Sequence, residues 1–218
     1  MTREYRKISR MLWTGVGLLI ATLFLALLLA QLRYRRSLGP PLQDLGPVAN
    51  FALTNQDGHA VSLADLRGHV WIGDIIFTRC MGPCLKMTRH MKELQQALPP
   101  RSDARLVTLT TDPDFDTPAV LKKRAEQVGA DPKRWMFLTG TKKELSNLAV
   151  NSLKLTAVEK KPEEREDPSD LFIHSTIFVV VDRNAHLRGV FQTTGEGIDP
   201  EQAKSQILAA ARRLERER

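Results

Sequence analysis

The sequence predicts an α/β domain with a mixed β-sheet flanked by helices, preceded by one transmembrane helix. Three observations support this prediction. Apolar strands alternate with amphipathic helices after residue 50, a pair of apolar strands follows them, and 21 uncharged positions run from Leu12 to Leu32. Alternating strands and helices favour a parallel sheet covered by helices, and the late pair adds antiparallel strands.

The uncharged segment is long enough to cross a membrane. As a helix, residues 12–32 span roughly 30 Å, the thickness of a bilayer core, and Trp13 and Tyr34 lie near its ends, where aromatic rings prefer the interface. The alternatives are a cleaved signal peptide, which the length of the apolar run disfavours, and a buried helix of a soluble protein.

The basic residues around this segment predict its orientation. Residues 1–11 are expected in the cytoplasm and the folded domain on the periplasmic, or equivalent, side of the inner membrane. This orientation is favoured by Arg3, Arg6, Lys7 and Arg10, and opposed by Arg33, Arg35 and Arg36.

The distribution of charge argues against nucleic-acid binding. The net charge of the 218 residues is +7, and residues 1–36 account for +6 of it. The rest of the chain is nearly neutral, so the basicity belongs to the ends of the apolar segment rather than to a binding face. Residues 33–50 contain several Gly and Pro and are expected to form a linker, which leaves residues 51–218 as one domain.

The first half of the domain contains four predicted elements. Two short strands flank the turn signal Asp57-Gly58, and a near-continuous apolar run predicts a buried strand. A helix follows, with apolar residues at helical spacing up to Pro99-Pro100. The predicted ranges are strands 51–54, 60–63 and 70–77, and a helix beginning near residue 84.

The second half continues the alternation. Asp116-Thr117-Pro118 predicts a helix start, Gly129 predicts its end, and Thr141 with Glu144 forms a capping-box pattern. The predicted strands are 105–110, 135–138, 172–182 and 187–193, with a charged loop at 157–170 and a last helix from Pro200. This order of elements predicts a thioredoxin-like arrangement, whose first β–α junction carries the chain's two cysteines.

Cys80 and Cys84 lie between the predicted strand 70–77 and the following helix. A helix N-terminus is expected to stabilise thiolates, and positions i and i+4 are expected to place both sulfurs on one face. One pair closing so short a loop adds little entropic stabilisation, so the pattern favours chemistry over a structural staple. The two candidate chemistries are disulfide exchange and binding of a soft metal.

The spacing and the number of the cysteines distinguish disulfide exchange from metal binding only in part. A structural zinc site usually has four protein ligands, and this chain has two cysteines. Disulfide oxidoreductases usually have two residues between their cysteines, whereas Cys80 and Cys84 have three. Cu(I) prefers thiolates and accepts an imidazole as a third ligand.

Three segments resemble the Sco/SenC family. They are Trp71 to Cys84 (WIGDIIFTRCMGPC), Thr110 to Pro118 (TTDPDFDTP) and Leu171 to Phe178 (LFIHSTIF). The resemblance covers roughly residues 48–212. It implies that Cys80, Cys84 and His174 bind copper, as Cu(I) with Cu(II) as the alternative. Two positions depart from the family pattern: Met81-Gly82-Pro83 lacks an acidic residue, and Leu85 stands where many members have proline.

The resemblance implies a metallochaperone rather than an enzyme. Its partners would be the copper-binding subunit of cytochrome c oxidase, or another copper protein, and a thiol reductant that keeps Cys80 and Cys84 reduced. Two alternatives stay open: a thiol–disulfide oxidoreductase with these cysteines as its redox pair, and a copper or redox sensor. His174 separates the first two hypotheses, because thiol exchange does not require a histidine ligand.

Other residues near these motifs are expected to be structural. Met87 and Met91 are predicted to pack in the core, and Asp74 to accept hydrogen bonds as a buried carboxylate. Asp112, Asp114 and Asp116 are expected to be turn and cap residues, and His59, His69, His90 and His186 are not predicted to bind metal. The loop from Glu159 to Asp170 is expected to move when metal binds.

Overall fold

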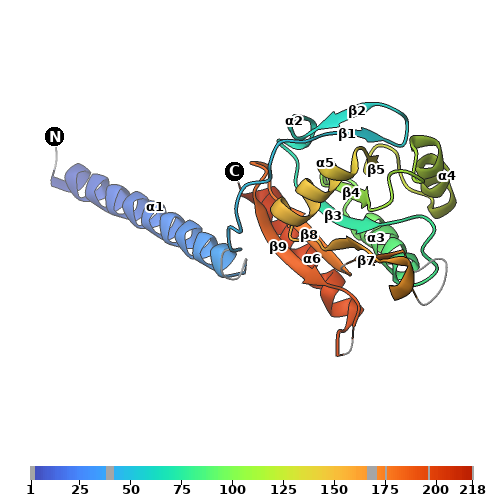
Figure 1. Cartoon of the computed structure of the whole chain (residues 1–218). Helices are drawn as coiled ribbons and strands as arrows, with labels where there is room; N and C mark the ends of the chain where they lie inside the picture. The colour runs from blue at the N-terminus through green and yellow to red at the C-terminus, as the bar shows by residue number, and fades with distance from the viewer. Residues whose placement is uncertain (1–2, 38–41, 166–170, 175, 196, 218) are drawn as a thin grey trace. The chain divides into compact units, whose positions relative to one another are not determined.

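The structure is a computed structural model that describes residues 3–37, 42–165, 171–174, 176–195 and 197–217 (Figure 1). The chain divides into two units, Met1–Pro41 and Leu42–Arg218. The first contains helix α1 (Arg3–Ser37). Within α1, Leu12–Gln31 is long and apolar enough to cross a membrane, with a mean hydropathy of 2.4 and no buried side chain.

The second unit is built on a mixed seven-stranded sheet, as predicted. Its strand order is β2-β1-β5-β4-β3-β8-β9, with β3, β4 and β5 parallel and the remaining pairings antiparallel. The strands are β1 (Ala52–Asn55), β2 (Ala60–Ser62), β3 (Trp71–Ile76), β4 (Arg105–Thr110), β5 (Trp135–Thr139), β8 (Ile177–Val181) and β9 (Leu187–Gln192).

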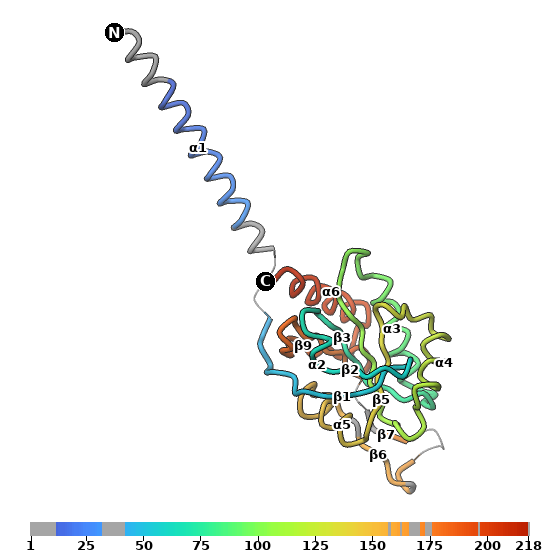
Figure 2. Tube along the Cα trace, turned by 90° about the horizontal axis from the view of Figure 1, so that it is seen from above, coloured from blue at the N-terminus to red at the C-terminus, as the bar shows by residue number. Residues whose placement is uncertain are grey.

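Helices cover both faces of this sheet, with α3 and α6 on one side and α5 on the other (Figure 2). Alternate residues of β3 enter two separate cores: Ile72 and Ile76 pack under α3 and α6, and Trp71 and Ile75 pack on the opposite face. This alternation explains why β3 is apolar along its length. The helices are α2 (Leu63–Leu66), α3 (Pro83–Ala97), α4 (Pro118–Val128), α5 (Lys142–Ser146), the π-helix η1 (Asn147–Ser152) and α6 (Pro200–Arg216).

The local start and stop signals act as predicted. Thr117 caps α4 by accepting the Val120 N–H, and Gly129 ends that helix in the left-handed region at φ 64°, which costs glycine least. Thr141 and Glu144 form the capping box of α5. Gly58 has φ 81° in the turn between β1 and β2.

The structure differs from the sequence prediction around residue 160. Residues 157–159, expected in a loop, form β6 (Ala157–Glu159), and Pro162–Glu164 forms the 3-10 helix η2. The expected strand 172–182 is divided into β7 (Phe172–His174) and β8. β7 leaves the main sheet and pairs with β6. Backbone pairing between segments distant in sequence carries no periodic signal, so the sequence did not reveal it.

The second unit also begins earlier than residue 51. Val48 is buried, and the backbone N–H groups of Leu45 and Val48 donate to the carbonyls of Leu187 and Ala185 at 2.8 Å. These hydrogen bonds attach residues 42–50, expected within the linker, to the turn and strand around β9.

We expect truncation of Leu94 on α3 to destabilise the fold. Its side chain is fully buried in the core under α3 and α6, so Leu94→Ala should cost about 2–5 kcal/mol of unfolding free energy. Gln96→Ala, at an exposed position of the same helix, should change it by less than about 0.5 kcal/mol. Urea unfolding followed by circular dichroism measures both, and equal effects would contradict the assignment of this core.

Candidate metal centre

Cys80 lies in the loop between β3 and α3, and Cys84 lies in the first turn of α3, at the carboxyl end of the central strands. Cys80 is 6% exposed and Cys84 is fully buried. Both belong to the apolar cluster that includes Phe77 and Met87. The thiols therefore lie in apolar surroundings, where little water is present to compete with sulfur for a metal ion.

The thiols are hydrogen-bonded to each other, and burial raises the pKa of the Cys84 thiol far above its usual range; Cys80 and the charge of Asp74 raise it further. The expected stabilisation of thiolate by the helix N-terminus is therefore wrong for Cys84 in the metal-free protein. Desolvation disfavours the charged form more strongly than the first turn of α3 favours it. The prediction that both sulfurs share one face of the helix was also wrong, because α3 begins at Pro83, after Cys80.

Asp74 is fully buried in the middle of β3. One of its carboxylate oxygens accepts a 2.7 Å hydrogen bond from the Thr108 hydroxyl on β4, and Thr108 in turn accepts the indole N–H of Trp135 on β5. The carboxylate is thus part of a polar chain across the three parallel strands. Its charge lies close enough to Cys84 to oppose a second negative charge there.

Asp116 holds the beginning of the cysteine loop. Its buried carboxylate accepts hydrogen bonds from the Thr78 N–H at 3.1 Å, from the Thr78 hydroxyl, and from the Thr110 hydroxyl at the end of β4. Burial raises the pKa of Asp116, and the hydrogen bonds from Thr110 and Thr78 oppose this increase. Asp116 was expected to be a turn or cap residue, whereas Thr117 is the cap and Asp116 joins three elements.

A second contact holds the residue next to Cys80. The Arg79 guanidinium donates to the Asp112 carboxylate from Nε at 3.0 Å and from Nη2 at 2.5 Å. The same guanidinium lies 4.4 Å from the centre of the Phe115 ring. Asp112 is nearly buried, so this ion pair is screened less than a surface pair. It ties the residue before Cys80 to the segment after β4.

The β6–β7 pair lies beside the cysteine loop. Phe172 on β7 packs edge to face on Phe77, with ring centres 5.1 Å apart. Lys142 on α5 forms ion pairs with Asp114 at 2.8 Å and with Glu159 on β6 at 3.6 Å. A cavity of about 120 Å³ lies here, and Thr110, Lys142, Glu159 and Phe172 are among the residues that line it.

The predicted ligand His174 is the last residue of β7, where its backbone is paired with Ala157. Its side chain lies outside the described part of the structure. Among the described residues, no three His, Cys, Asp or Glu side chains gather closely enough to hold a metal ion. The structure therefore brings Cys80 and Cys84 together and places the His174 backbone two positions along the strand from Phe172.

The methionines near the cysteines differ in their exposure. Met87 and Met91 are fully buried, as expected, and Met81 is 74% exposed. Sequence reasoning missed the tie between Thr78 and Asp116 and the contact between Phe77 and Phe172. The concentration of Thr and Asp residues between Thr110 and Thr117 is the sequence signal that could have indicated a polar cluster here.

A mixed sheet with helices on both faces and a dithiol at the first β–α junction define a thioredoxin-like protein. Residues 43–212 match the family model SCO1/SenC. The chain is 40% identical to the SCO1 protein homolog of Bacillus subtilis over 136 residues, which cover 62% of this chain and 67% of that protein. The chain therefore belongs to the SCO1/SenC family.

Solved structures agree with this assignment. A SCO1/SenC family lipoprotein from Bacillus anthracis superposes with a TM-score of 0.67 at 26% identity, over 80% of this chain and 99% of that one. BsSco, a Sco family protein for which a disulfide switch has been identified, gives 0.61 at 29% identity, over 79% and 98%. Bradyrhizobium japonicum ScoI with copper bound shares the fold, at 0.60 and 23% identity over 74% and 97%.

We expect Asp116→Asn to loosen the cysteine loop. A carboxamide replaces one of the two accepting oxygens by a donor, so part of the Thr78 and Thr110 hydrogen bonding is lost, at a cost of about 1–3 kcal/mol of unfolding free energy. Cys80 should then react faster with iodoacetamide in the reduced, metal-free protein. Asp114→Asn is the matched control, because its side chain is 76% exposed and forms only a surface ion pair. Equal alkylation rates in both variants and the parent would contradict the role of Asp116.

Proposed function

We propose that this protein is a copper chaperone that binds copper through Cys80, Cys84 and His174 and delivers it during assembly of cytochrome c oxidase. The observation that carries the proposal is the pair of buried, mutually hydrogen-bonded thiols at the end of β3. Membership of the SCO1/SenC family supports it, as do family structures that contain copper, such as those of Bradyrhizobium japonicum ScoI and yeast Sco1.

The donor chemistry fits copper as cargo. Cu(I) is a soft ion that prefers thiolate sulfur and accepts imidazole nitrogen. The two thiols lose their protons when the metal binds, and the apolar surroundings of Phe77 and Met87 keep water from competing. A site with three protein ligands leaves one side open, through which a partner's ligands can take the ion.

The position of β7 beside the cysteine loop supports His174 as the third ligand. Phe172 holds β7 against Phe77 next to the cysteine loop, and Lys142 joins Glu159 on β6 to Asp114 after β4. The described contacts of the β6–β7 pair with the rest of the domain include this ring contact, the buried Leu171 side chain just before β7, and the exposed ion pairs of Lys142. The exposed ion pairs contribute little to stability, so we infer that the third ligand can approach or withdraw as copper enters or leaves.

We also propose that residues 12–32 anchor the chain in the inner membrane, with the domain on the periplasmic side. The support is the apolar helix Leu12–Gln31 and a relative that is a lipoprotein. In that compartment a thiol reductant is required, because an oxidised Cys80–Cys84 pair cannot supply thiolates to Cu(I). The recipient is the copper-binding oxidase subunit or another copper protein.

Copper stoichiometry of the reduced full-length protein tests the proposal. The parent should bind one copper per chain. His174→Ala should weaken binding by at least tenfold, because removing a ligand costs more than the roughly 10–100-fold loss on removing a second-shell partner. Binding is measured anaerobically by competition with a Cu(I) chelator.

His59→Ala is the matched control for this experiment, because His59 is exposed near the turn between β1 and β2. It should leave copper affinity unchanged. Copper binding that is the same in the His174→Ala and His59→Ala variants would overturn the three-ligand site.

A second candidate function is thiol–disulfide exchange with a partner's metal-binding cysteines. The hydrogen bond between Cys80 and Cys84 favours it, and so does the disulfide switch identified in BsSco. In this reaction the two thiols are oxidised to a disulfide as a partner disulfide is reduced to two thiols, with no net change in protons or electrons.

Under this second candidate, His174→Ala should reduce a disulfide-bonded peptide at the same rate as the parent, because no step uses the imidazole. Cys84→Ser should abolish turnover while leaving Cys80 able to form a mixed disulfide. Mass spectrometry of quenched reactions detects the reduced peptide and the mixed disulfide. A parent protein that exchanges no faster than Cys84→Ser would exclude this function.

A further inference from the structure

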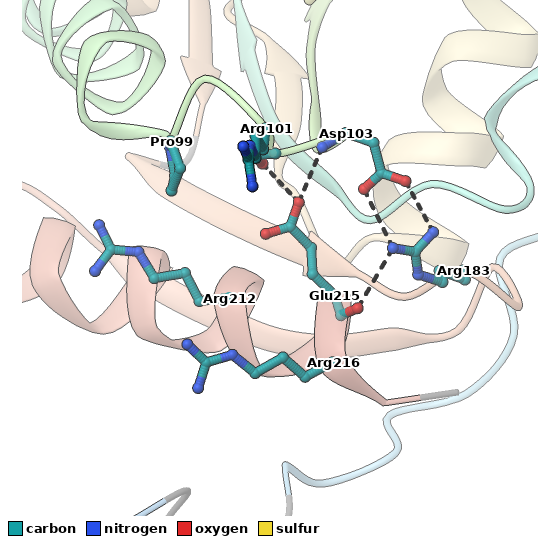
Figure 3. Close-up of a pocket in the computed structure, with 8 residues that line it drawn as sticks. Pro99, Arg101, Asp103, Arg183, Arg212, Glu215 and Arg216 are labelled. Carbon is teal, nitrogen blue, oxygen red and sulfur yellow. Dashed lines mark hydrogen bonds and ion pairs between the residues drawn. The ribbon is translucent and has the colours of Figure 1, made fainter.

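A second cavity lies at the end of the sheet opposite the cysteines. It has a volume of about 540 Å³ and lies between the last turns of α6 and the segment that leads into β4 (Figure 3). The residues that line it are Pro99, Arg101, Ser102, Asp103, Arg183, Arg212, Glu215 and Arg216. Four arginines and two acids give the lining a net positive charge.

The two carboxylates of the cavity, Asp103 and Glu215, accept hydrogen bonds from neighbouring protein groups. Arg183 donates to both Asp103 oxygens, at 2.9 and 3.2 Å. Glu215 accepts the Ser102 hydroxyl at 2.6 Å and the Asp103 N–H at 3.1 Å. Asp103 is therefore paired with Arg183. Glu215 has neutral donors and keeps its charge, so the four arginines and two carboxylates of the lining leave a net charge of +2.

Arg101, Arg212 and Arg216 are the exposed cations of the cavity. Among the described residues none of the three forms an ion pair, and Arg212 donates to the Ala97 carbonyl at 3.4 Å. Arg212 and Arg216 are one turn apart on α6, and Figure 3 shows their side chains extending in the same direction. Basic residues at a helix C-terminus are favoured by the helix dipole, but Arg101 belongs to no helix, so the dipole does not account for the cluster.

We propose that this cavity binds a phosphate group, carried by an anionic lipid headgroup of the membrane. Guanidinium groups bind phosphate oxygens through paired, charge-assisted hydrogen bonds, and a bound anion relieves the repulsion among Arg101, Arg212 and Arg216. Free inorganic phosphate shares this chemistry and is the alternative source.

The N-terminal end of the folded unit favours the lipid as the source. Arg188 donates to the carbonyl of Leu42 at 3.0 Å and pairs with Glu217 at 3.4 Å. Leu42, the first residue of this unit, is thus joined to the residue after Arg216, at the end of α6 that lines the cavity. In sequence, residues 38–41 separate Leu42 from the helix that we propose as the membrane anchor. The lipid source rests on that proposed anchor, whereas the phosphate site does not.

Arginine-specific labelling of the full chain in nanodiscs tests the proposal. One arm compares phosphatidylcholine discs with discs that also contain phosphatidylglycerol, and the other titrates inorganic phosphate into phosphatidylcholine discs. Phenylglyoxal modification is followed by mass spectrometry at Arg101, Arg212 and Arg216. Exposed Arg89 on α3 serves as the internal control. We expect phosphatidylglycerol to slow modification of the three cavity arginines and to leave that of Arg89 unchanged.

Charge-matched variants sharpen the test. Arg101→Gln with Arg216→Gln should remove the protection of Arg212, weakening binding about fivefold per arginine. Arg89→Gln with Lys123→Gln, which removes two exposed charges elsewhere, should preserve it. Copper stoichiometry should be unchanged in both.

The outcomes are distinct. Protection by inorganic phosphate alone supports the anion site and overturns the lipid source. No protection in either arm, equal slowing at Arg89, or protection of Arg212 that survives the Arg101→Gln, Arg216→Gln variant overturns the site. Failure of the chain to remain in nanodiscs would overturn the proposed anchor, and the inorganic phosphate arm would still decide the site.

Discussion

The geometry of the cysteine site depends on one buried carboxylate. Asp116 accepts hydrogen bonds from Thr78 and Thr110, and so ties the end of β3, the end of β4 and the start of α4 to one point. The Arg79–Asp112 pair and the packing of Cys80 in the core also hold this loop. A loop fixed by hydrogen bonds to a buried anion is preorganised, which lets two thiols meet a metal without the loop first having to order.

The same site shows two opposing effects of burial. Burial raises the pKa of the Cys84 thiol in the metal-free protein, which disfavours its reactive thiolate form. It also creates the dry, apolar surroundings in which a soft cation is held by sulfur rather than by water. Under the proposed function, copper binding and proton release are therefore coupled, and the metal, rather than the helix N-terminus, generates the thiolates.

The two ends of the sheet have different chemistry. Apolar packing and buried carboxylates surround the cysteines at the carboxyl end of β3, whereas arginines line a cavity at the other end. The proposed phosphate site would fix the orientation of the domain with the cysteines directed away from the lipid surface.

The sequence by itself determined the apolar helix, the mixed sheet and the position of the dithiol, because periodicity, caps and turn residues act over a few residues. Gly129 and the capping box of Thr141 and Glu144 are examples. Only the tertiary structure decided that β7 pairs with β6, that Asp116 reaches Thr78, and that Cys84 is desolvated. These features depend on contacts between segments far apart in the chain, and the energy of burying a group is set by every element that covers it rather than by its neighbours in sequence.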